Sequence, residues 1–128
     1  MKQNSRPINV GIGDLVSFKW PITAISSITH RVAGVVLFIG VAFMLYALDL
    51  SLSSEQGFIS LKEMMVSPLG KMITWGLLSA LGYHFVAGIK HLLMDMGVGE
   101  TLEGAQFAAK TTLFFSAVLI ALAAIWVI

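Results

Sequence analysis

Three long apolar runs dominate the chain, and shorter polar segments separate them. The first two are Val32–Leu48 and Met72–Ile89, and the third closes the sequence. About 20 consecutive apolar residues are enough to cross the hydrocarbon core of a bilayer as an α-helix. We therefore expect an all-α membrane protein with three transmembrane helices, over residues 22–50, 69–96 and 105–128.

The polar segments are predicted to connect these helices within a single membrane domain, residues 1–128. Residues 1–21 are expected to form an irregular lead at the membrane surface, because Pro7 and two nearby glycines disfavour a long helix there. Residues 51–70 are expected to form a loop. A short amphipathic helix over 59–65 is the alternative for that segment.

Composition narrows both the class of protein and the kinds of site. Of the 128 residues, 57% are hydrophobic and 12% are charged, which places the chain in the membrane class. The absence of cysteine excludes disulfides, thiolate zinc sites and Cys-ligated iron–sulfur clusters within this chain. With a net charge of +1 and no cluster of basic residues, we expect no nucleic-acid partner.

The distribution of basic residues predicts the orientation in the membrane. The side that holds the N-terminus would carry Lys2, Arg6, Lys19, Arg31, Lys90 and Lys110, and the opposite side Lys62 and Lys71. Cytoplasmic segments carry the excess of Lys and Arg. We therefore expect a cytoplasmic N-terminus and a C-terminus on the opposite side.

The second apolar run ends in a stripe of polar side chains. On a helix, His84, Gly88, His91 and Asp95 fall within roughly 40° of one line. A histidine in a membrane span is a candidate functional residue, because it is costly to place in hydrocarbon. A haem held by the His84 imidazole is the leading interpretation. The alternative is that His84 makes a hydrogen bond between packed helices.

A second group of polar residues lies at the start of the first helix. Ser27, His30, Arg31 and Gly34 share one helix face by their i, i+3, i+4, i+7 spacing. The Arg31 guanidinium can hold a haem propionate or polarise a quinone carbonyl, and Ser27 can donate to the same oxygen. The alternatives are that Arg31 extends to lipid headgroups and that Ser27 bonds its own backbone.

His91 and Asp95 lie at or beyond the membrane interface in this interpretation. They can hold haem propionates, bind water for proton delivery or pair with each other, or simply form a solvated helix end. A haem with two imidazole ligands needs one more histidine, from His30 or from a partner subunit. Three helices hardly enclose a macrocycle, so we expect a partner anchor subunit to complete the bundle.

Two segments resemble the cytochrome b subunit of succinate dehydrogenase, the larger membrane anchor of respiratory complex II. Residues 20–34, WPITAISSITHRVAG, are similar to the first helix of that family. Residues 83–95, YHFVAGIKHLLMD, match its second-helix pattern H-x-x-x-G-x-[RK]-H-x-x-x-D. The resemblance covers the three-helix layout and is strongest to proteobacterial members. Position 90 is lysine here, where arginine is common in the family.

The resemblance implies a site shared between subunits in the bacterial inner membrane, with the C-terminus in the periplasm. His84 would be an axial ligand of haem b, and the smaller anchor subunit would supply the other imidazole. Ser27 and Arg31 would bind ubiquinone, and His30 and Arg31 would lie near the haem propionates. An iron–sulfur subunit and a flavoprotein subunit would dock on the cytoplasmic side, with succinate oxidised on the flavoprotein and electrons passed to the quinone.

Two other functions fit parts of the pattern. A quinol:fumarate reductase anchor would run the same chemistry in the opposite direction, and the sequence hardly distinguishes the two. A small proton-relay or transport protein could use His30, His84 and Asp95. The relay is disfavoured because the outer half of the predicted bundle has no strongly polar groups to continue it.

Overall fold

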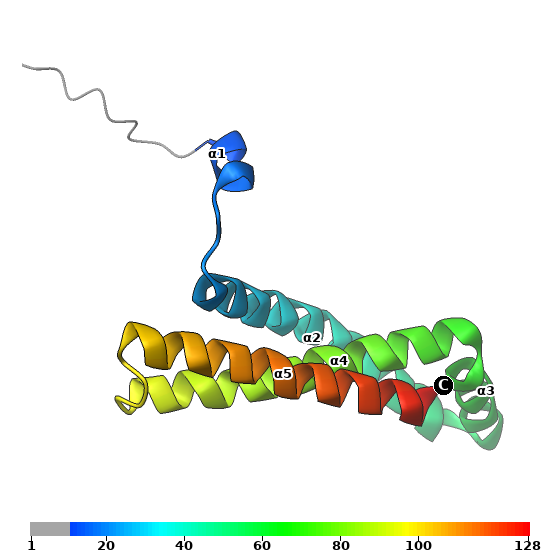
Figure 1. Ribbon diagram of the computed structural model, residues 1–128. Helices are drawn as coiled ribbons and strands as arrows, with labels where there is room; N and C mark the ends of the chain where they lie inside the picture. The colour runs from blue at the N-terminus through cyan, green and yellow to red at the C-terminus, as the bar shows by residue number, and fades with distance from the viewer. Residues whose placement is uncertain (1–10) are drawn as a thin grey trace, which may run out of the picture.

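The computed structural model describes residues 11–128, and these residues form helices joined by short connections (Figure 1). The helices are α1 (Ile12–Ser17), α2 (Ile22–Ser53), α3 (Glu55–Val66), α4 (Pro68–Asp95) and α5 (Leu102–Val127). Three of them, α2, α4 and α5, are long and apolar enough to cross a membrane. This confirms the prediction of an all-α protein with three membrane spans.

The start of the lead, with Lys2, Arg6 and Pro7, lies outside the described residues. Its second half contains only the six-residue helix α1, which stands apart from the other helices in Figure 1. The Trp20 indole Nε1 donates to the carbonyl oxygen of Leu15 at 3.0 Å, and this contact folds the link to α2 back onto α1.

The loop predicted over residues 51–70 is wrong for most of its length, because α3 occupies twelve of those positions. The alternative of a short helix over 59–65 lies within α3. Two serines separate the helices by capping them. The Ser54 side chain accepts from the Gly57 N–H, and the Ser67 side chain accepts from the Gly70 N–H. Serine is a favoured N-cap, and Pro68 suits the first position of α4. Each serine therefore ends one helix and begins the next.

Helix α4 is the centre of the bundle and packs against α2 on one side and α5 on the other. Helix α2 also contacts α5, and α3 lies against α2 and α4. The buried core is small and consists mainly of Ala33, Tyr83 and Ala87. Small residues at helix contacts let backbones approach closely, as membrane helices require. Most large apolar side chains point outward instead, as expected for a surface that faces lipid.

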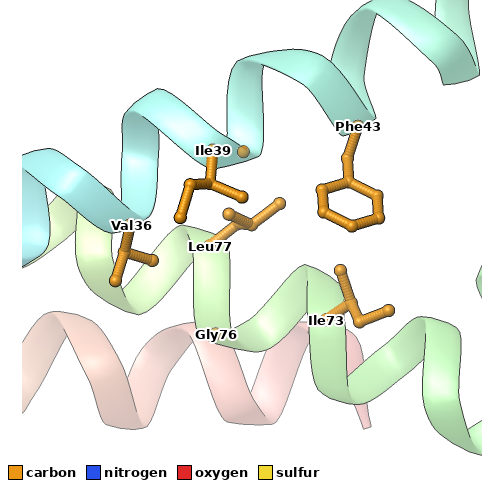
Figure 2. Close-up of a pocket in the computed structure, with 7 residues that line it drawn as sticks. Val36, Ile39, Phe43, Ile73, Gly76 and Leu77 are labelled. Carbon is orange, nitrogen blue, oxygen red and sulfur yellow. The ribbon is translucent and has the colours of Figure 1, made fainter.

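The two ends of the α2–α4 pair differ. We call the end where α2 begins and α4 finishes the histidine end, and the opposite end the α3 end. Between them, Leu77 of α4 packs against Gly40 of α2. Toward the α3 end the helices leave an apolar groove of about 280 Å³ (Figure 2). A second apolar cavity of about 460 Å³ lies between α2, α3 and α4.

Candidate functional site

Three imidazole rings stack at the histidine end. The ring centroids of His30 and His84 are 4.1 Å apart with an interplanar angle of 20°. Those of His30 and His91 are 4.9 Å apart at 22°. Helix α4 thus presents His84 and His91 on the shared face that their spacing predicts, and α2 inserts the His30 ring between them.

The His84 ring is oriented by the backbone of α2. Its Nδ1 lies 3.2 Å from the carbonyl oxygen of His30. A carbonyl can only accept, so in the neutral imidazole the proton is on Nδ1 and Nε2 keeps its lone pair. This arrangement, with one ring nitrogen on a carbonyl and the other free, is typical of histidines that bind metals. The close approach requires Gly34, where a Cβ atom would lie 3.1 Å from His84 Cε1.

The other two rings are held differently. The Nδ1 of His91 lies 2.7 Å from the carbonyl oxygen of Ala87, within the same helix. The Nε2 of His30 is buried and has no hydrogen-bond partner within residues 11–128. A Cβ at Gly88 would come within 3.7 Å of that atom. A buried polar atom without a partner is costly, so His30 Nε2 indicates that a further group completes this site.

The described part of the chain contains no group of three or more His, Asp or Glu side chains placed to hold a bare metal ion. It does contain two half-buried imidazoles, those of His84 and His91, whose Nδ1 faces a carbonyl oxygen and whose Nε2 makes no hydrogen bond. A haem iron needs only axial ligands from the protein, because the porphyrin supplies the rest. The donor set at His84 therefore fits a haem better than a bare ion.

Tyr83, Lys90 and Ser26 tie α2 to α4, and the sequence interpretation did not predict these contacts. The Tyr83 hydroxyl donates to the carbonyl oxygen of Ser26 at 2.9 Å. The Lys90 Nζ donates to the Ser26 Oγ at 3.3 Å. Ser26 is fully buried. The available signal was the i, i+7 pair Tyr83 and Lys90, which repeats the His84–His91 spacing on the neighbouring face of α4.

The comparisons with known proteins agree with one family. Residues 4–123 match the succinate dehydrogenase/fumarate reductase transmembrane subunit family. The chain is 37% identical over 123 residues to the succinate dehydrogenase cytochrome b556 subunit of Coxiella burnetii. These residues cover 95% of this chain and 96% of the relative. It is 30% identical over 119 residues to the cytochrome b556 subunit of Paracoccus denitrificans, covering 93% and 89%. The chain belongs to the succinate dehydrogenase cytochrome b family, the membrane anchor of complex II. A pig mitochondrial relative, the cytochrome b560 subunit, is 33% identical over 101 residues, covering 77% of this chain and 58% of that protein.

Membership of the succinate dehydrogenase family settles the class of function. The chain is a subunit of an enzyme complex and crosses the membrane three times. Membership of this family does not support the proton-relay alternative. Asp95, which that alternative required, is exposed at the end of α4, and its side chain makes no hydrogen bond or ion pair within residues 11–128.

The two residues predicted to bind quinone are not part of the imidazole stack. Arg31 is exposed, Ser27 is half-buried, and neither side chain has a hydrogen-bond partner in the described part of the chain. Ser26 points into the bundle, so Ser27 and Arg31 lie roughly 100° and 140° further around α2. In this anchor subunit they therefore face outward at the histidine end, where lipid or another subunit would meet them.

Proposed function

We propose that this subunit binds haem b through the Nε2 of His84, and that a second anchor subunit supplies the other axial imidazole. The observation that carries the proposal is the His84 Nδ1 contact with the His30 carbonyl oxygen at 3.2 Å, because it leaves Nε2 as a ligand. Helix α4 presents this ring toward α2 and the bundle surface rather than into the small core. The relatives named cytochrome b556 agree with a b-type haem.

Residues around His84 favour a flat ligand with acidic substituents. Gly34 and Gly88 lack side chains, which lets the His84 and His30 rings lie directly against the facing helix. His30 Nε2, which lacks a partner, and the exposed Arg31 would hold the haem carboxylates, with His91 at the outer edge of the stack. When bound, the haem would accept and release one electron at a time.

We further propose that Ser27 and Arg31 form this subunit's part of the ubiquinone site. Both lie at the histidine end and leave their side chains free for a ligand or a neighbouring subunit. The Ser27 hydroxyl would donate to a quinone carbonyl oxygen, and the Arg31 guanidinium would stabilise negative charge as it develops on that oxygen. The iron–sulfur subunit would deliver electrons to this end, and the flavoprotein subunit would oxidise succinate.

The same assignment sets the orientation in the bacterial inner membrane. The histidine end would face the cytoplasm, with the N-terminus on that side and the C-terminus of α5 in the periplasm. The excess of Lys and Arg at this end supports the proposal.

Replacing the proposed ligand tests the haem assignment. In the assembled complex, His84→Ala should remove the b-type absorbance of the dithionite-reduced protein, because the variant lacks the proposed axial ligand of this subunit. His91→Ala tests the other imidazole whose Nδ1 faces a carbonyl oxygen, and it should leave most of the haem bound if His84 is the ligand. A reduced spectrum that His84→Ala leaves unchanged would rule out His84 as the ligand.

A further inference from the structure

Lys90 occupies an unusual place for a lysine near a membrane interface. Only 7% of its surface is exposed, and it faces the interior of the three-helix bundle beside Tyr83 and Ala87. Lysines at the ends of membrane helices normally extend their charged group to the interface. Lys90 instead turns inward, so its position calls for an explanation beyond the positive-inside rule.

The charge of Lys90 is poorly compensated within this chain. An ammonium group has three donors, and the one acceptor found for it is the Ser26 Oγ at 3.3 Å, a long hydrogen bond. Within residues 11–128 no Asp or Glu forms an ion pair with it. A buried charge with so little compensation acts on its surroundings more strongly than a charge in water.

The ammonium group is held in place rather than free to move. Ser26 is fully buried, and its carbonyl oxygen accepts from the Tyr83 hydroxyl at 2.9 Å. Ala87, also fully buried, lets α2 and α4 approach closely between these two contacts. The serine that receives Lys90 is therefore fixed to α4 at a second point.

This fixed charge lies close to the proposed haem ligand. Ser26 is one helical turn before His30, whose ring stacks on both His84 and His91. Lys90 and His84 are six residues apart on α4, which is roughly 9 Å along the helix axis. Over that distance, in a membrane interior, a full charge changes the stability of a nearby redox centre.

We propose that Lys90, held by Ser26 and Tyr83, is a positioning residue that raises the electron affinity of the haem bound to His84. The inference rests on the proposed haem role of His84. One electron enters the haem, and the reduced form then carries one positive charge fewer. A fixed cation favours that form electrostatically. Lys90 gains and loses no proton in this step and does not touch the iron.

A redox titration of the assembled complex, followed by haem absorbance, tests the proposal. Lys90→Met keeps a flexible chain but removes the charge. We expect the ratio of reduced to oxidised haem at a fixed potential to fall about tenfold, which for one electron is a shift of about −59 mV. In Lys90→Arg the ratio should stay within about twofold of the wild-type value, because the charge is kept.

Lys110→Met is the matched control, since it removes the same charge from an exposed position near the start of α5. An unchanged titration in Lys90→Met with normal haem content would overturn the proposal, and so would equal shifts in Lys90→Met and Lys110→Met. If Lys90→Met does not assemble, Ser26→Ala serves instead, because it frees the ammonium group to move toward water. A smaller shift in the same direction is then expected, and no shift overturns the proposal. A wild-type complex without haem would refute the proposed function itself.

Discussion

Helices α2 and α4 run alongside each other, yet they are joined in two different ways. At the histidine end, polar contacts connect them, with Tyr83 and Lys90 on Ser26 and with His84 on the His30 carbonyl. At the α3 end, apolar side chains line a groove between the same two helices (Figure 2).

The difference shows which end of the helix pair fixes how α2 and α4 pack against each other. Polar groups in a membrane span are costly unless they are paired, so their concentration at one end marks the part that the function requires. Each polar contact also has a direction, which fixes the rotation of α2 against α4. The groove has no directional contacts and tolerates rearrangement. Substitutions at the histidine end should therefore have large effects, and matched substitutions at the α3 end small ones.

Removing a cation from each end gives the largest expected contrast. Arg31→Ala should lower quinone reductase turnover about 10²-fold, the scale for losing one charge-stabilising donor. Lys62→Ala, on exposed α3, should leave turnover unchanged. Succinate oxidation with an artificial acceptor, measured on the same complexes, should be normal in both variants. Equal turnover in the two variants would refute the quinone role of Arg31.

Much of this contrast could be predicted from the sequence. The three apolar runs predict the spans, and the spacing of His84 and His91 predicts their common face. The sequence does not predict which of Ser26 and Ser27 points into the bundle, because this depends on how α2 is rotated against α4. Helix α2 is apolar on nearly every side beyond Arg31, so its sequence hardly limits that rotation.

Two predictions from the sequence are wrong for identifiable physical reasons. The sequence predicts a loop at α3 because Gly57, Pro68 and Gly70 favour turns, although Ser54 and Ser67 are both N-cap signals. The sequence predicts an interfacial position for Lys90, because its place in the interior arises only from its contact with α2.

Replacing a glycine with alanine should change the free energy of unfolding in opposite directions at the two ends. At Gly34 a new Cβ would lie 3.1 Å from His84 Cε1, and the His84 ring has little freedom to move because it stacks on His30. Gly34→Ala should therefore lower the free energy of unfolding by about 1–3 kcal/mol and alter the haem spectrum. At Gly76 nothing lies within 4 Å, so Gly76→Ala should raise stability by about 0.5–1 kcal/mol through helix propensity.

Thermal unfolding of the two variants in the same detergent, followed together with haem absorbance, measures both effects. If Gly34→Ala were as well tolerated as Gly76→Ala, the His84 ring would be mobile. The contact of His84 with the His30 carbonyl oxygen would then no longer support the haem assignment.

The smallest effect is expected where the two regions meet, at Gly40. A Cβ there would lie only 2.5 Å from Leu77 Cδ2, which would predict a large penalty in a close-packed core. The clashing atom, however, is the end of a flexible side chain that also lines the groove. Leu77 can turn into that space, and alanine is the better helix former, so the change in unfolding free energy should stay below about 1 kcal/mol. A loss as large as that of Gly34→Ala would mean that the α3 end is as rigidly packed as the histidine end, and the distinction between the two regions would fail.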